Sequence, residues 1–186
     1  MKANNKRKPY RLLLLMILAL LTLSACSASK IYIVRHAEKA VQPANDPILT
    51  TDGERRADAL KEALKDASID VIIVSDLQRT QLTAQPLATH LGLEPIIIAV
   101  RPPSNANQYV QNVVNEINAN WKGRDILVVS HNSLLQQIAQ NLGSPEIGTI
   151  SEETGYDNFF VIIKPRDSIN SKFVRLRYGQ PPKEVN

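Results

Sequence analysis

Short apolar runs alternate with longer amphipathic stretches through most of the chain. The apolar runs are rich in β-branched and aromatic residues, as buried strands are, and span residues 31–34, 71–74, 95–100, 126–129, 159–163 and 173–177. The stretches between them have the pattern of helices and span residues 53–66, 77–91, 107–121 and 132–142. Strands separated by helices favour a mostly parallel sheet that helices cover on both faces. We therefore predict an α/β fold, a three-layer α/β/α sandwich whose six-stranded sheet ends in a hairpin at its edge.

Local signals sharpen the expected helix boundaries. Asp52 has a side chain suited to capping the helix that follows it. Gly92 comes directly after the second helix, where glycine adopts the left-handed conformation that ends many helices. Pro86 lies inside this second helix and has no amide hydrogen to donate. We therefore expect a kink at Pro86 or a break into two pieces.

The N-terminal residues follow a different pattern, with a basic stretch, an apolar run over residues 12–23 and then two small residues. A run of this length is too short to span a bilayer, which needs about 20 residues. It fits the core of a signal peptide, which has roughly 7–15 residues. The sequence Leu23-Ser24-Ala25-Cys26 directly after it resembles a bacterial lipobox. That resemblance implies that Cys26 is lipidated and becomes the first residue of the mature chain.

The chain is thereby divided into three expected parts. Residues 1–25 form a lipoprotein-type signal peptide, residues 26–30 the lipidated cysteine and a short tether, and residues 31–186 one folded domain. The lipobox implies a bacterial envelope protein that is anchored to a membrane through Cys26 and faces the periplasm. Ser27 is not an aspartate, and this favours the outer membrane over the inner one.

Charge is unevenly distributed along the chain. Its formal net charge of +4 comes from 22 basic and 18 acidic residues. Five of the basic residues lie before residue 26, and without them 17 basic residues face 18 acidic ones. The basic excess belongs to the targeting segment and does not indicate nucleic-acid binding. The single cysteine excludes a disulfide framework or a cysteine-rich zinc site within the chain.

Basic side chains follow three of the predicted strands where each strand ends. Arg35 and His36 follow the first strand, Arg79 comes soon after the second, and His131 follows the fourth. Because ligands bind beyond the carboxyl ends of parallel strands, we expect these side chains to lie together at one edge of the sheet. Guanidinium groups match phosphate oxygens, and a neutral imidazole can attack phosphorus and carry the group covalently. Helix N-termini after His36 and His131 would add backbone donors, so the set predicts phosphoryl transfer.

Several motifs in this order resemble the histidine phosphatase superfamily, also called phosphoglycerate mutase-like. They are Arg35-His36, Ser75-x-x-x-Arg79-Thr80-x-x-Thr83-Ala84 and Ser130-His131. The segments Leu49-Thr50-x-x-Gly53-x-x-Arg56-Ala57 and Tyr156-Asp157-Asn158-Phe159-Phe160 also resemble a small bacterial subgroup. Ala37 stands where the family commonly has glycine, in an Arg-His-Ala-Glu-Lys form that occurs in small phosphatase branches. The resemblance covers nearly all of residues 31–178.

The resemblance implies a role for each residue at this edge. His36 would be the nucleophile that becomes phosphohistidine. Arg35, Arg79 and Asn132 would bind the phosphoryl group, while His131 would bind it and stabilise the transition state. The first and fourth strands are neighbours in the family's sheet, so His36 and His131 would meet. The mechanism requires no metal and no organic cofactor.

The proton donor for the leaving group is where the chain departs from the family pattern. The family often places a glutamate in an insertion after the third strand or an aspartate directly after the second histidine. Here residues 101–111 contain no acid, and Asn132 follows His131. Glu38 and Asp157 are the candidates for this role.

Three further polar residues are expected to be structural. Ser75 and Thr80 suit helix capping and support of their neighbours rather than reaction. His90 lies near the end of the second helix, where a positive charge suits the helix dipole.

The expected function is a lipid-anchored phosphatase that hydrolyses phosphomonoesters through a phosphohistidine intermediate. Its substrate would be a phosphorylated small molecule or an envelope component, for example a sugar phosphate, a lipid-linked phosphate or a phosphorylated glycan. A mutase is less favoured, because the chain lacks the long insertions with which family mutases enclose their substrate and exclude water. Two alternatives stay open: a phosphohistidine protein phosphatase, and a non-catalytic phosphate-binding lipoprotein on the same fold.

Overall fold

The computed structural model describes residues 28–102, 105–151, 155–165 and 171–181. Strands and helices alternate along these residues, and every predicted element is present. The elements are β1 (Ser29–Arg35), α2 (Thr51–Leu64), β2 (Val71–Ser75), α3 (Gln78–Leu91), β3 (Ile96–Ile98), α4 (Ala106–Asn120), β4 (Ile126–Ser130), α5 (Asn132–Asn141), the 3₁₀ turn η1 (Gly155–Asp157), β5 (Asn158–Lys164) and β6 (Lys172–Arg177).

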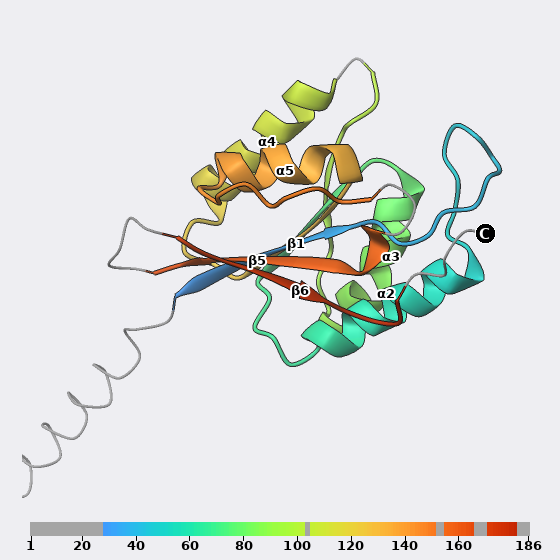
Figure 1. Cartoon of the computed structure of the whole chain (residues 1–186), viewed down its shortest axis with the longest axis horizontal. Coiled ribbons are helices and arrows are strands. Elements are labelled where there is room, and N and C mark those ends of the chain that lie inside the picture. The colour runs from blue at the N-terminus through green and yellow to red at the C-terminus, as the bar shows by residue number, and fades with distance from the viewer. Residues whose placement is uncertain (1–27, 103–104, 152–154, 166–170, 182–186) are drawn as a thin grey trace, which may run out of the picture.

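The strands form one six-stranded sheet in the order β3-β2-β4-β1-β5-β6. The first four in this order are parallel, whereas β5 and β6 form the antiparallel hairpin at the edge. Helices α4 and α5 cover one face of the sheet, and α2 and α3 cover the other (Figure 1). The predicted three-layer sandwich is confirmed. β1 and β4 are direct neighbours, with Arg35 opposite Ser130, as the family resemblance implies.

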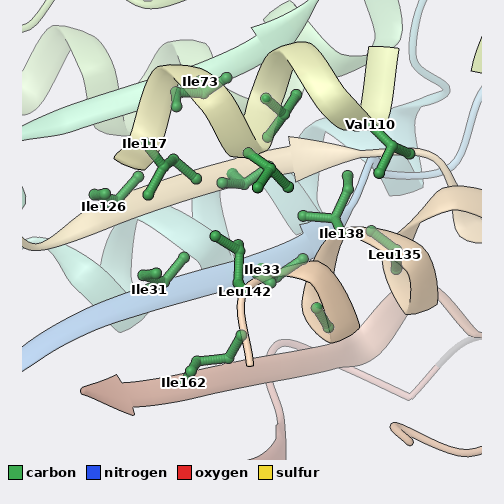
Figure 2. Packing of buried hydrophobic residues seen from close by; sticks show 14 of the residues in the cluster. Ile31, Ile33, Ile73, Val110, Ile117, Ile126, Leu135, Ile138, Leu142 and Ile162 are labelled. Atoms are coloured by element: carbon green, nitrogen blue, oxygen red, sulfur yellow. The ribbon is translucent and has the colours of Figure 1, made fainter. Parts of the chain in front are cut away.

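Alternate positions on each central strand build two separate cores. On β1, Ile31 and Ile33 pack towards α4 and α5, whereas Tyr32 and Val34 pack towards α2 and α3. Figure 2 shows the first core, in which helix and strand side chains meet; among them are Val110, Ile117, Leu135, Ile138, Ile73 and Ile126. Because helices cover both faces, the central strands are continuous apolar runs, and this made them recognisable in the sequence.

The first helix begins and ends two residues earlier than predicted. Its N-cap is Thr50, whose Oγ1 accepts a hydrogen bond of 3.1 Å from the amide of Gly53. Asp52 lies in the first turn, where its carboxylate accepts a 2.7 Å bond from Arg55. The prediction of Asp52 as the cap was wrong, because the hydroxyl of Thr50 already reaches the free amide at the start of the helix.

A kink or a break was expected at Pro86; helix α3 continues through this residue as one element, so the break does not occur. Proline removes one amide hydrogen from the helix, but α3 packs along α2 and against the sheet through buried apolar residues, among them Leu87. Gly92 ends the helix with a φ of 66°, in the left-handed conformation predicted for it. Tertiary packing therefore outweighs the local effect of the proline.

The first strand begins at Ser29, two residues before the predicted start of the folded domain. The expected signal peptide and Cys26 lie outside the described residues. Within the described ranges, no helix combines the length and the apolar character needed to cross a membrane.

Candidate active site

Four predicted side chains meet at the carboxyl ends of β1, β2 and β4. Arg35 is the last residue of β1 and His36 follows it, while His131 follows β4. Arg79 lies in the first turn of α3, just after β2. The ring centres of His36 and His131 are 5.5 Å apart, and Nη2 of Arg79 lies 3.5 Å from Nδ1 of His131. The structure thus brings the predicted residues together, and their catalytic roles remain a prediction.

His36 is held as a neutral imidazole with one free ring nitrogen. Its Nδ1 lies 2.8 Å from the carbonyl oxygen of Ala37, so Nδ1 carries the hydrogen and Nε2 keeps its lone pair. The amide of His36 donates to the carbonyl oxygen of Ser130 at 2.9 Å, which ties it to β4. Burial lowers the pKa of His36 to about 3; the bond to Ala37 opposes this effect, and His131 and Arg35 add to it. A neutral imidazole is the form that can act as a nucleophile.

Arg35 is buried and is held in place by Tyr156. Its guanidinium carbon lies 3.9 Å from the centre of the Tyr156 ring, in a cation–π contact. Its Nη1 also donates to the carbonyl oxygen of Ser151 at 3.3 Å. The Tyr156 ring lies 6.2 Å from that of His36. Sequence reasoning noted the Tyr156 motif but did not place the tyrosine at the site.

Arg79 brings a positive charge that no carboxylate in the described ranges neutralises directly. It makes no ion pair with any described residue, and its buried Nε has no hydrogen-bond partner in the described part of the chain. Burial lowers the pKa of Arg79; Asp46 opposes this effect, and Arg35 and Arg101 add to it. An unpaired guanidinium with buried donors is suited to binding a phosphoryl group.

His131 is the N-cap residue of α5 and is oriented by Ser75. Its Nε2 lies 3.0 Å from Ser75 Oγ, while its Nδ1 faces Arg79. Burial lowers the pKa of His131 to about 4; Arg79 adds to this effect and Asp76 opposes it. Ser75 therefore supports the histidine, in agreement with the expectation that it is structural.

Thr83 ties the first two motifs together. Its Oγ1 accepts a 2.8 Å bond from the amide of Ala37 and donates a 2.6 Å bond to the carbonyl oxygen of Arg79. The methyl group of Ala37 is fully buried against Leu49 and Ala57. The alanine that replaces the family's usual glycine thus fills a small apolar cluster beneath the site.

The two predicted proton donors are both bound to arginines. The carboxylate of Glu38 accepts hydrogen bonds from Nε and Nη2 of Arg56 at 2.7–2.9 Å. Both carboxylate oxygens of Asp157 lie 2.6 Å from Nη1 of Arg177. These contacts tie each carboxylate to a separate segment, Glu38 to α2 and Asp157 to β6. The geometry favours a structural role for both carboxylates.

Sequence reasoning overlooked two other carboxylates near the site, those of Asp46 and Asp76. Arg101 binds both: its Nε donates to Asp76 at 2.7 Å, and its Nη1 lies 3.4 Å from Asp46. Arg101 lies in the segment after the third predicted strand, which contains no acidic residue. This segment therefore supplies an arginine that binds two aspartates from other segments. Asp76 lies at an unspecified position of the Ser75-x-x-x-Arg79 motif, and Asp46 lies in no quoted motif, so the motifs did not single out this cluster.

Backbone donors are arranged differently from the prediction. Helix α5 starts directly after His131, as expected, and Asn132 is its first residue, with Nδ2 donating to the carbonyl oxygen of Ile150 at 3.2 Å. No helix follows His36, because residues 37–50 form a loop before α2. The prediction of a helix N-terminus there was wrong, since this loop first pairs Lys39 with Leu49.

Among the described residues, no three His, Cys, Asp or Glu side chains gather to hold a metal ion.

The family model for the histidine phosphatase superfamily (branch 1) matches residues 31–100. This stretch contains the first histidine motif, the Arg79 motif and the strands that position them. Over this stretch, which is less than half of the chain, the sequence is similar to the histidine phosphatase superfamily.

Curated relatives match part of the chain. A protein named "probable phosphoglycerate mutase GpmB" from Cronobacter sakazakii is 39% identical over 74 residues, which are 37% of this chain and 34% of the relative. The protein of that name from Yersinia enterocolitica is 36% identical over 73 residues, again 34% of its length. The matched region therefore spans about a third of the curated relatives.

Solved histidine phosphatases share the fold across most of the chain. The mycobacterial glucosyl-3-phosphoglycerate phosphatase superimposes with a TM-score of 0.58 at 15% identity, covering 78% of this chain and 97% of the other. The α-ribazole phosphatase from Shigella flexneri gives 0.58 at 19% identity, covering 84% and 100%. The protein histidine phosphatase SixA, in complex with tungstate, gives 0.57 at 20% identity, covering 80% and 96%. At these identities the likeness shows a common fold.

Proposed function

We propose that the protein is a phosphatase that hydrolyses phosphomonoesters through a phosphohistidine on His36. The observation that carries this proposal is the hydrogen bond from Nδ1 of His36 to the carbonyl oxygen of Ala37 at 2.8 Å. It leaves the lone pair on Nε2, beside the donors of Arg35 and Arg79. A neutral nucleophile next to two guanidinium groups suits attack on a phosphoryl dianion.

The reaction would proceed in two displacements. In the first, Nε2 of His36 attacks phosphorus, the bond to the ester oxygen breaks, and the released alkoxide takes a proton from solvent. In the second, water attacks the phosphohistidine, the phosphorus–nitrogen bond breaks, and its electron pair returns to Nε2 as inorganic phosphate and a proton leave. Arg35 and Arg79 would bind the equatorial oxygens, where transition-state charge is spread. Their donors are in place before substrate arrives, so little reorganisation is needed.

Hydrolysis is favoured over mutase activity by the short connection after β3. Only residues 99–105 separate β3 from α4. A mutase must keep water away from its phosphohistidine until the group returns to the substrate. Because curated relatives are named as phosphoglycerate mutases, release of phosphate and phosphoglycerate isomerisation should be measured side by side.

We also propose that the protein is anchored in the bacterial envelope through a lipid on Cys26. The anchor would join β1 at Ser29, and the site lies at the other end of this strand, after Arg35. Seven residues of strand span about 20 Å, at roughly 3.3 Å per residue. This separation supports a water-soluble phosphomonoester, such as a sugar phosphate or a glycan phosphate, over a lipid-linked phosphate in the anchoring leaflet. Incorporation of labelled palmitate into the wild type, and its loss in Cys26→Ser, would test the anchor.

The decisive experiment is hydrolysis of p-nitrophenyl phosphate, combined with trapping of a labelled phosphoenzyme. We expect turnover and an acid-labile, alkali-stable label in the wild type, and neither in His36→Ala. His90→Ala is the matched control, because His90 is an exposed histidine near the end of α3 and outside the site. A label that survives in His36→Ala would contradict the assigned nucleophile.

The same assay separates the two alternatives. A protein that binds phosphate analogues but forms no phosphoenzyme would be a non-catalytic binding protein. A protein that removes phosphate from phosphohistidine in a peptide, and not from phosphomonoesters, would be a phosphohistidine protein phosphatase. SixA, a protein histidine phosphatase of the same fold, keeps the second alternative in view.

A further inference from the structure

Two buried hydroxyl groups extend in a chain from the ring nitrogen of His131 that does not face Arg79. Nε2 of His131 lies 3.0 Å from Ser75 Oγ, and Ser75 Oγ lies 2.9 Å from Thr80 Oγ1. Ser75 and Thr80 are both fully buried. The groups form a chain that starts at His131 and ends at the carbonyl oxygens of Ser75 and Leu77.

Each hydroxyl group has a single hydrogen, which limits the chain to two directions. In the first arrangement, Thr80 donates to the carbonyl oxygen of Leu77 at 2.9 Å, Ser75 donates to Thr80, and Nε2–H of His131 donates to Ser75. Nδ1 then holds a lone pair that faces Nη2 of Arg79 at 3.5 Å. Every hydrogen in the chain has an acceptor, so this arrangement suits the site without a phosphoryl group.

In the second arrangement both hydroxyl groups are reversed. Thr80 donates to Ser75, Ser75 donates to Nε2 of His131, and the ring hydrogen is on Nδ1. Ser75 Oγ still accepts the amide of Leu77 at 3.3 Å, and Thr80 Oγ1 still accepts the amide of Ser75 at 3.1 Å. The carbonyl oxygen of Leu77 loses the hydrogen bond from the Thr80 hydroxyl group but still accepts the one from the amide of Thr80 at 3.0 Å. A phosphoryl oxygen opposite Nδ1–H would provide the acceptor that this arrangement lacks.

We propose that Ser75 and Thr80 form a reversible hydrogen-bond chain that lets a neutral His131 present Nδ1–H to a bound phosphoryl group. The inference rests on the proposed function, because it assigns a proton arrangement to the same site. The exchange conserves protons: Nε2 loses one to solvent, Nδ1 gains one, and the two hydroxyl groups rotate. Ser75 and Thr80 are therefore positioning residues that act through His131.

The surroundings of His131 favour a neutral ring. The titratable and charged groups that face it from the neighbouring elements are Arg79, Asp76, Arg35, His36 and Tyr109. Burial, together with Arg79, holds the pKa of His131 at about 4. Two guanidinium groups already balance a phosphoryl dianion, so a charged imidazole would add a surplus charge at a buried position. When the hydroxyl chain reverses, Nδ1–H of His131 becomes a hydrogen-bond donor to the phosphoryl group while the ring stays neutral.

The test is the ¹⁵N NMR spectrum of the histidine side chains, recorded near neutral pH with and without tungstate. Tungstate is a dianion of phosphate-like shape, and the spectrum distinguishes Nε2–H, Nδ1–H and imidazolium forms of each ring. We expect His131 to be mainly Nε2–H in the free protein and mainly Nδ1–H with tungstate. A ring that stays Nε2–H, or becomes imidazolium, when tungstate binds would overturn the inference and leave the proposed function intact.

Two variants give opposite expectations for the free protein. In Thr80→Val the hydroxyl of Ser75 keeps only Nε2 as its acceptor, so His131 should already be mainly Nδ1–H without tungstate. Thr80→Ser retains the hydroxyl and should keep the wild-type ratio of forms. Ser130→Ala is the matched control, because Ser130 is an equally buried strand-end serine whose hydroxyl contacts Tyr109 at 3.1 Å instead of His131. A Thr80→Val spectrum identical to the wild type would contradict the chain.

The outcomes also separate this inference from the proposed function. If tungstate changes neither His36 nor His131, the site does not bind a phosphoryl-like anion and both proposals fail. If Thr80→Val does not fold, Ser75→Ala provides the second test. It removes the one hydrogen-bond partner that the described residues offer to Nε2. The free protein should therefore show an averaged mixture of the two neutral forms, and an unchanged Nε2–H form would overturn the chain.

Discussion

The guanidinium group of Arg56 binds the carboxylate of Glu38 through three contacts of 2.7–2.9 Å. The Arg56 side chain is 5% exposed and that of Glu38 19% exposed, so solvent screens the pair only weakly. Arg56 also donates to the backbone carbonyls of Tyr178 and Gln180 at 3.3 and 3.1 Å. The pair therefore joins the segment after the nucleophile motif to α2 and to the residues that follow β6.

Replacement of Glu38 by glutamine should destabilise the protein more than it alters the chemistry. Loss of one partner leaves the Arg56 charge buried and uncompensated, which costs about 3–5 kcal/mol in comparable pairs. Chemical denaturation should show this loss in the free energy of unfolding. The pH dependence of kcat should keep its shape, because we assign Glu38 to the support of the fold.

The control for this prediction is Asp58→Asn, which removes an exposed acid that contacts Lys61 on the surface of α2. Its effect should stay within about 0.5 kcal/mol, as for most surface pairs. A Glu38→Gln protein of normal stability that loses the basic limb of its pH–rate profile would show instead that Glu38 donates a proton.

Replacement of Gly53 by alanine should lower stability, although alanine usually favours a helix interior over glycine by roughly 1 kcal/mol. A Cβ atom at this position would collide with the backbone carbonyl oxygen of Glu38, which is not the end of a flexible side chain. The backbone must shift, and overpacking of this kind costs typically 1–3 kcal/mol. Thermal unfolding measures the change, and an increase in stability would show that the loop before α2 yields freely.

Stability should fall in mildly acidic solution because two histidines are buried in their neutral forms. Their pKa values, about 3 for His36 and about 4 for His131, lie below the ordinary value of 6.5. The unfolded chain therefore binds protons that the folded chain does not, and stability is complete above pH 6.5 and decreases as pH falls towards 4.

Denaturation at pH 7.5 and at pH 4.5 would measure this effect. The loss of stability between the two should be smaller by about 3 kcal/mol in His36→Gln, since pH 4.5 lies about two units below the ordinary pKa and each unit corresponds to about 1.4 kcal/mol. His90→Gln is the control and should keep the wild-type loss. An equal loss in all three proteins would mean that other groups govern acid unfolding.

Patterns that repeat along the chain made the fold predictable, whereas contacts between distant segments did not. The central strands are apolar on both faces, and Gly92 ends α3 as its position suggests. Of the kink or break expected at Pro86, the break is absent, because packing against α2 and the sheet maintains α3. Local propensity is a weak guide where buried packing contributes more.

The same distinction holds at the site. Its four central side chains could be predicted, because each follows a strand and parallel strands end at one edge. The partners of the predicted proton donors could not, because Arg56 lies 18 positions from Glu38 and Arg177 lies 20 positions from Asp157. Pairings of this kind depend on how α2 and β6 approach the site, and no periodic pattern records that approach.

Tyr156 provides a last prediction, since its ring lies 3.9 Å beneath the guanidinium carbon of Arg35. Tyr156→Phe retains an aromatic face and should keep near wild-type activity on p-nitrophenyl phosphate. Tyr156→Leu removes the cation–π contact, which is worth about 0.5–2 kcal/mol depending on how far water is excluded. Arg35 should then hold the phosphoryl group less well, and kcat/KM should fall by roughly 2- to 30-fold, since 1.4 kcal/mol is a factor of about ten. Equal losses in the two variants would assign the effect to the hydroxyl group and not to the ring.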